Sequence, residues 1–184
     1  MNKHIKEILY NWLPLAVTIT LLCGLIYVAA QQNYRMSAND PQIQLAEDVR
    51  TEILQGQSPK AFIPVRKLEL SKTLATFIML YDEKGSIIGT SVTLDGKNPV
   101  IPQGVLDNAK NNGQTKITWQ PKNGVREALV VYYYKGQQAG YVAIGRSLRE
   151  VEIREDNLFK IVFAGWIFTL LASFLTFYFL KKNK

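Results

Sequence analysis

Two long apolar stretches, one near each end of the chain, dominate its hydrophobic pattern. Residues 13–30 are 18 consecutive positions without a formal charge, and residues 161–180 are 20 such positions. As α-helices, these stretches would be about 27–30 Å long, which matches the hydrocarbon core of a bilayer. The pattern therefore predicts two transmembrane helices, which we place at residues 13–30 and 158–180.

Residues 31–157, between the two stretches, have the mixed polar and apolar pattern of a folded domain. Its first part predicts a helix that is capped by Asn39 or Asp40 and ends at Gly56. Apolar residues recur there at spacings of three and four, which places them on one face of the helix: Ile43, Ala46, Val49 and Ile53.

The rest of the domain predicts five strands and a short helix. The strands are expected at residues 76–81, 86–92, 115–120, 126–134 and 138–146, and the short helix at residues 104–112. Glycine-containing turns separate most of these elements. The order helix, two strands, short helix, three strands predicts an α+β fold, in which an antiparallel sheet has its helices packed on one face.

The periodicity changes back to that of a helix after the last strand. Ser147 is a suitable cap, and neither glycine nor proline occurs between Ser147 and Gly165. A single helix of about 50 Å is therefore expected from Ser147 to Leu180. Such a helix would join the last strand directly to the second membrane span, so that a small movement of the domain would displace the span.

The flanking charges predict the orientation in the membrane. Lysines lie outside both apolar stretches, whereas residues 31–158 carry 16 Lys and Arg against 14 Asp and Glu. Because short basic flanks stay in the cytoplasm, we expect residues 1–12 and 181–184 to be cytoplasmic and the central domain to be extracytoplasmic. The net charge of +7 then reflects topology, and no nucleic-acid partner is expected.

A cleaved signal peptide is the alternative for the first stretch. The residues Val28-Ala29-Ala30 would suit a signal peptidase, but the uncharged run reaches back to Ile8. This run is long for a signal peptide, so a retained anchor is favoured.

Few residues in the central domain are suited to catalysis or metal binding. The only cysteine, Cys23, lies in the first apolar stretch, and the only histidine, His4, lies in the N-terminal tail. The domain therefore has no disulfide, and most metal sites and common catalytic triads are excluded. We expect neither a metal nor a cofactor, and no enzymatic activity.

Two segments resemble a known class of proteins. The segment Gly140–Glu152 resembles the end of the extracytoplasmic sensor region of bacterial membrane histidine kinases. The run Tyr81–Gly85, followed by Ile87 and Ile88, resembles the strand-turn-strand of Cache and PAS-like sensor domains. The resemblance implies a PAS/Cache-like antiparallel sheet with a long N-terminal helix, located in a bacterial cell membrane between two transmembrane helices.

The resemblance does not extend to a kinase domain. Only residues 181–184 follow the second span, and no phosphoacceptor helix or glycine-rich phosphate loop is present. We therefore expect a two-span sensor that passes an extracytoplasmic signal to a histidine kinase or to another membrane protein. The alternative is an accessory or structural membrane protein whose outside domain docks an envelope partner.

The resemblance also implies where a small-molecule ligand would bind. PAS-like sensors hold ligands between the sheet and the segments that lie over it, and the candidates there are Trp119, Arg126, Tyr132 and Tyr134, with Thr118 as a hydrogen-bonding partner. Arg126 would make a two-pronged contact with a carboxylate. The other interpretation is that alternate residues of 128–134 face the core and that Arg126 is solvated.

Sensors of this type usually act as homodimers with paired membrane helices. Leu148, Val151 and Leu158 would extend such pairing beyond the lipid. Alternatively, Leu148 and Val151 pack on the sheet of their own domain, and the sequence favours neither interpretation.

Overall fold

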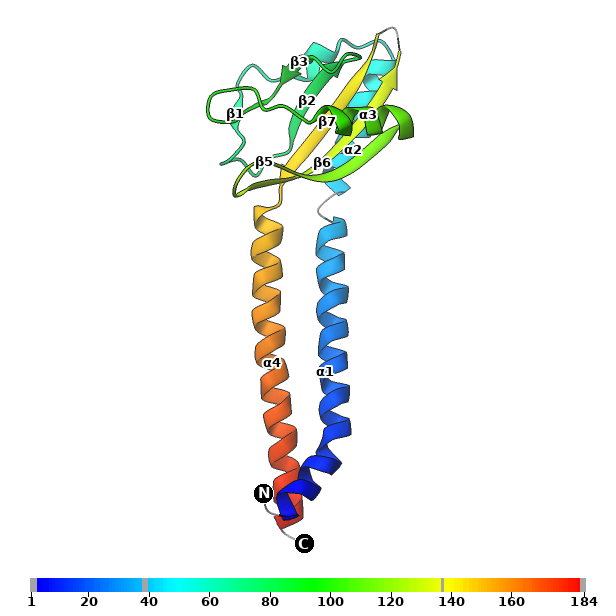
Figure 1. The fold of residues 1–184 in the computed structure, drawn as a ribbon. Coiled ribbons are helices and arrows are strands. Elements are labelled where there is room, and N and C mark those ends of the chain that lie inside the picture. Colours follow the sequence, from blue (N-terminus) through cyan, green and yellow to red (C-terminus); the bar gives the residue numbers. More distant parts are fainter. Residues whose placement is uncertain (1–2, 38–39, 137, 183–184) are drawn as a thin grey trace. The chain divides into compact units, whose positions relative to one another are not determined.

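The computed structural model describes residues 3–37, 40–136 and 138–182. The chain divides into two units, an α+β domain of residues 36–151 and a helical unit of residues up to 35 together with residues from 152 onward. Two long helices contribute to the helical unit, α1 (Lys3–Ser37) and α4 (Arg149–Lys182) (Figure 1). Both are long and apolar enough to cross a membrane.

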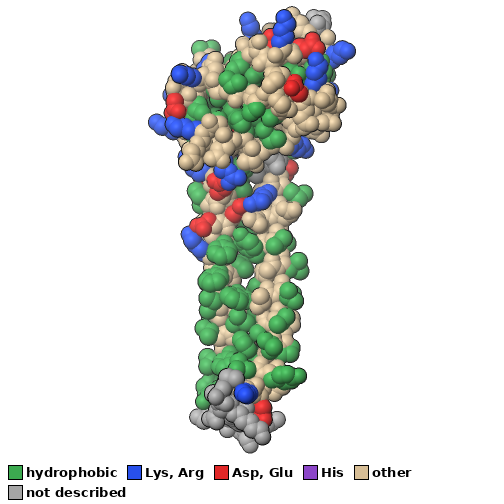
Figure 2. Space-filling model, in the orientation of Figure 1, with side chains coloured by type: hydrophobic (Ala, Val, Ile, Leu, Met, Phe, Trp, Pro, Cys, Tyr) green, Lys and Arg blue, Asp and Glu red, His purple; other side chains and the backbone are tan. Residues whose placement is uncertain are grey.

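Within the helical unit, α1 and α4 run antiparallel and side by side (Figure 1). Near one end, the indole N–H of Trp12 donates a hydrogen bond of 2.9 Å to Oγ of Ser173. Further along, the indole N–H of Trp166 donates one of 3.0 Å to Oγ1 of Thr20. These polar contacts join helices whose outer surfaces are largely hydrophobic (Figure 2), an arrangement suited to association in an apolar medium.

The domain is built on a five-stranded antiparallel sheet in the order β3-β2-β7-β6-β5. Its strands are β2 (Phe77–Asp82), β3 (Ile87–Thr90), β5 (Gln114–Lys122), β6 (Val125–Lys135) and β7 (Ala139–Ser147). The centre of the sheet is β7, which pairs with β2 on one side and with β6 on the other. The predicted α+β class and antiparallel sheet are confirmed.

Helices cover both faces of the sheet, so the prediction that they pack on one face is wrong. The helix α2 (Asp40–Leu54) packs on one face, and α3 (Gln103–Asn112) packs on the other. The reason lies in the central strands, where the consecutive residues Leu129, Val130 and Val131 are all fully buried. Because successive side chains of a strand point to opposite faces, such a run needs a cover on each side.

The helix α2 matches its prediction closely. It runs from Asp40 to Leu54, and its predicted apolar residues Ala46, Val49 and Ile53 are buried. Asn39, the other predicted cap, lies outside the described residues. Gly56, the predicted end, has a φ of 101°, a conformation that glycine adopts readily after a helix.

The predicted strand at residues 86–92 is interrupted. It forms β3 and a separate short strand β4 (Val92–Thr93), which pairs in parallel with β1 (Leu68–Glu69). At the break, the hydroxyl of Ser91 accepts a 2.8 Å hydrogen bond from the N–H of Ile78, while the carbonyl oxygen of Ser91 accepts one of 2.9 Å from the N–H of Leu68 in β1. Neither β1 nor the 3₁₀ helix η1 (Pro59–Phe62) is evident in the sequence pattern.

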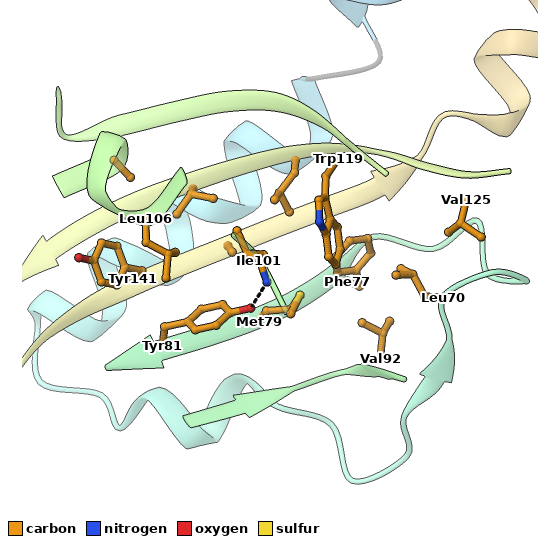
Figure 3. Packing of buried hydrophobic residues seen from close by; sticks show 14 residues of the cluster. Leu70, Phe77, Met79, Tyr81, Val92, Ile101, Leu106, Trp119, Val125 and Tyr141 are labelled. Atoms are coloured by element: carbon orange, nitrogen blue, oxygen red, sulfur yellow. Dashed lines mark hydrogen bonds between the residues drawn. The ribbon is translucent and has the colours of Figure 1, made fainter. Parts of the chain in front are cut away.

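Large side chains fill the space between the sheet and α3 (Figure 3). Phe77, Tyr81 and Tyr141 are almost completely buried there. The hydroxyl oxygen of Tyr81 accepts a 3.3 Å hydrogen bond from the N–H of Ile101, and burial raises the pKa of Tyr81 to about 12. This face of the sheet is therefore a packed core held by an internal polar contact.

Candidate functional site

The last strand of the sheet, β7, is connected to the helix α4 by a very short segment. Only Leu148 separates the end of β7 at Ser147 from the start of α4 at Arg149. The N–H of Leu148 donates a 2.9 Å hydrogen bond to the carbonyl oxygen of Arg126 in β6. The N–H of Arg149 donates a longer one, 3.4 Å, to Oγ of Ser147. We call residues 147–149 and the side chains around them the junction.

A buried carboxyl group lies at the junction. Glu127 in β6 is opposite Ser147 of β7 and opposite Trp119 of β5 in the sheet register. It is 1% exposed, and neither of its carboxyl oxygens has a hydrogen-bond partner. An unpartnered charge at such a position is strongly disfavoured, because its loss of hydration is not compensated.

Burial therefore raises the pKa of Glu127 to about 8. The guanidinium of Arg149, the first residue of α4, acts in the opposite direction and lowers this pKa. Nη2 of Arg149 donates a 3.3 Å hydrogen bond to the carbonyl oxygen of Lys72. At neutral pH the carboxyl group thus mostly keeps its proton, while the nearby cation is bound to a backbone carbonyl.

The structure separates the five predicted ligand-binding residues. Trp119 is buried on the face covered by α3, where its ring lies 6.5 Å from that of Phe77 (Figure 3). Tyr132 and Tyr134 are buried on the opposite face, against α2. Thr118 and Arg126 are exposed. The resemblance to PAS-like sensors grouped these residues, and the sequence alone did not reveal which positions of β5 and β6 share a face.

A cleft in the domain lies elsewhere, at the end of α2. It has a volume of 410 Å³ and is lined by Ile53, Gly56, Gln57, Ser58, Pro59 and Gln138. None of the five predicted residues lines it. Among the described residues, no three His, Cys, Asp or Glu side chains gather in a way that would hold a metal ion.

The predicted dimerisation residues lie along the start of α4. Leu148, Val151 and Leu158 are all half-buried within the single chain. Leu148 belongs to the junction through its hydrogen bond to Arg126. Whether these side chains also meet a second copy of the chain stays a prediction.

Sequence reasoning missed Glu127, although a signal for it was present. Val125, Glu127 and Leu129 alternate along one strand, and all three are buried. Because side chains two positions apart in a strand point to the same face, a buried Leu129 implies that the carboxyl group of Glu127 is buried as well. Arg149 was missed because nothing local distinguishes it from the other charged residues at the start of α4.

Tyr132 offers a direct test of the packing between α2 and the sheet. Its hydroxyl donates a 2.9 Å hydrogen bond to Oε1 of Glu47, and burial is the main cause that raises its pKa to about 12. We expect Tyr132→Phe to lower the free energy of unfolding by about 1 kcal/mol, measured by chemical denaturation. Tyr133→Phe is the control, because its hydroxyl contact with Glu83 is longer, at 3.5 Å, and exposed. Equal effects of the two substitutions would contradict this assignment.

Comparisons with known proteins do not assign the chain to a family. No protein-family model matches it, and a search of curated proteins finds no similar sequence. The resemblance to sensor regions of histidine kinases therefore stays a prediction from the residues that carry it.

Proposed function

We propose that this protein is a two-span membrane sensor that passes an extracytoplasmic signal to a partner protein in the same membrane. In this proposal α1 and α4 cross the membrane, both termini are cytoplasmic and the domain is outside. The observation that carries the proposal is the junction, where the central strand of the sheet continues into α4 after one residue. A strand that is hydrogen-bonded on both sides shifts with the sheet, so a rearrangement of the domain would be felt at the start of α4.

Such a sensor needs an effector that binds two arrangements of the junction with different affinity. A ligand with equal affinity for both would bind without transmitting anything. The receiver is proposed to be a histidine kinase or another membrane protein, and the sensor is proposed to act as a homodimer. No catalytic step is assigned to the chain.

A second candidate function is docking of an envelope protein without any small ligand. The packed interior favours it, because Phe77, Tyr81 and Tyr141 fill the space between the sheet and α3. An exposed apolar side chain is also available for contact, since Val65 is fully exposed between Pro64 and Arg66.

Cysteine labelling in intact cells tests the proposed topology. In a Cys23→Ser background, a membrane-impermeant maleimide is expected to label Asn123→Cys, in an exposed turn of the domain. The same reagent should leave Lys6→Cys, in the predicted cytoplasmic tail, unlabelled until the cells are opened. The reverse pattern would refute the topology and, with it, the proposed function.

Thermal unfolding of the full chain in lipid nanodiscs separates the two candidate functions. Amino acids, organic acids and nucleobases are the first probes, and a raised midpoint with one of them would support sensing. A midpoint that no probe changes, combined with a protein that co-purifies only when the domain is intact, would support docking.

A further inference from the structure

The junction contains a titratable group whose protonation is coupled to the first residue of α4. Glu127 is enclosed at the end of the sheet from which α4 departs, next to Trp119 on one side and Ser147 on the other. Both of its oxygens lack hydrogen-bond partners. Such a side chain is less unfavourable when neutral than when charged, and the charged form needs a new partner.

The elements around Glu127 offer few charged partners. α4 contributes Arg149, whose charge acts on Glu127, and the segment before β2 contributes Lys72, whose side chain is exposed. β5 contributes Lys122, which is paired with Asp95 at 2.8 Å. Arg146 of β7 lies at the register position opposite Ala128, on the other face of the sheet. Arg149 is therefore the cation that an ionised Glu127 would attract.

We propose that Glu127 is a proton-operated switch that controls the position of the first turn of α4. In the protonated state, the carboxyl group stays neutral against Trp119, and Arg149 binds the carbonyl oxygen of Lys72. When Glu127 releases its proton to water, its carboxylate draws Arg149 away from Lys72, and α4 shifts at its start. The regulatory meaning of this switch rests on the proposed function, whereas the switch itself is a property of the domain.

The effect of pH on the stability of the protein follows from the raised pKa of Glu127. The pKa of Glu127 is raised to about 8 in the folded protein, above the value of about 4.3 for an unperturbed glutamate. Between these values the folded state binds more protons than the unfolded state. The contribution of Glu127 to the free energy of unfolding is therefore greatest at a pH near the pKa of the unfolded state. It falls as the pH rises towards the pKa of the folded state.

The first experiment measures unfolding midpoints of the full chain in nanodiscs between about pH 5 and about pH 9. Glu127→Gln keeps the shape of the neutral carboxyl group, so its midpoint is expected to fall less with pH than that of the wild type. Glu83→Gln is the control, because this exposed carboxylate has a lowered pKa and stays ionised in this range. Identical profiles for the wild type and Glu127→Gln would overturn the proposal.

The second experiment measures movement at the start of α4. A nitroxide label on Ile153→Cys, in a Cys23→Ser background, reports the mobility of an exposed position in α4. The wild-type spectrum is expected to change between about pH 6 and about pH 9.5, whereas Glu127→Gln should keep the low-pH spectrum throughout. Arg149→Gln should abolish the spectral change and raise the pKa of Glu127 further, because the attracting cation is removed.

These outcomes also separate the switch from the proposed function. Arg149→Gln keeps the switch testable if Glu127→Gln does not fold. A wild-type spectrum that stays constant with pH would overturn the switch even if the labelling in cells confirms the topology. A spectrum that changes as expected supports the switch even if the labelling shows a different topology, since the purified protein is measured independently of its orientation in cells.

Discussion

Leu129→Ala is expected to lower the free energy of unfolding of the domain by about 2–5 kcal/mol. Leu129 lies in the middle of β6, between Ile117 of β5 and Gly145 of β7, and its side chain is completely buried. Truncation removes apolar contacts and leaves a cavity, because neighbours in a hydrogen-bonded sheet cannot collapse to fill it. Chemical denaturation of the full chain in nanodiscs measures the loss.

An exposed aliphatic residue provides the control. Val100 is 67% exposed, so Val100→Ala should change the free energy of unfolding by no more than about 0.5 kcal/mol. If Leu129→Ala were as mild as Val100→Ala, β6 would not be a central strand of the core.

Gly145→Ala is expected to cost about 1–3 kcal/mol through overpacking, although it adds a single methyl group. A Cβ atom at this position would lie 2.8 Å from Cε1 of Phe77 and still closer to Cζ. Phe77 cannot move aside easily, because it is completely buried and its ring packs on Trp119. The glycine in β7 is therefore required by the ring that lies over it, and the unfolding midpoint should fall.

Two further variants identify overpacking as the cause. Gly104→Ala in α3 has no heavy atom within 4 Å of the added carbon, so it should be neutral or stabilising by up to about 1 kcal/mol. Phe77→Leu removes part of the ring and should recover some of the stability lost in Gly145→Ala, a coupling that a double-mutant cycle measures. Independent, additive effects would show that the two residues do not meet.

The buried carboxyl group of Glu127 affects the stability of the domain at the junction. Glu127 destabilises the sheet whenever it is charged, and a buried leucine or glutamine would avoid this cost. Under the proposed switch, this destabilisation drives the movement of Arg149. A carboxylate that already had hydrogen-bond partners would gain little from pairing with Arg149. The same argument requires a weakly held guanidinium, and Nη2 of Arg149 makes an exposed 3.3 Å hydrogen bond to the carbonyl oxygen of Lys72.

Local pattern was sufficient for the elements of the fold. The predicted strands at 126–134 and 138–146 became β6 (Val125–Lys135) and β7 (Ala139–Ser147), and the predicted short helix became α3. These elements follow from short-range regularities, a period of two in strands and of three to four in helices, which a chain carries whatever its neighbours are. The two long apolar helices follow equally from the absence of charge over many consecutive positions.

Contacts between residues far apart in the sequence determine how the elements pack and what surrounds each buried side chain. The alternation in β6 does not reveal which face of the sheet meets α2 and which meets α3, so Trp119 was grouped with Tyr132 although they lie on opposite faces. The hydroxyl of Ser91, at the break, accepts its hydrogen bond from Ile78, which is 13 residues earlier in the chain. Residue type and spacing define the elements, whereas the burial of Glu127 and the contacts of Arg149 depend on segments that only folding brings together. Burial and electrostatic effects of this kind are properties of the assembled structure, because they depend on distances in space.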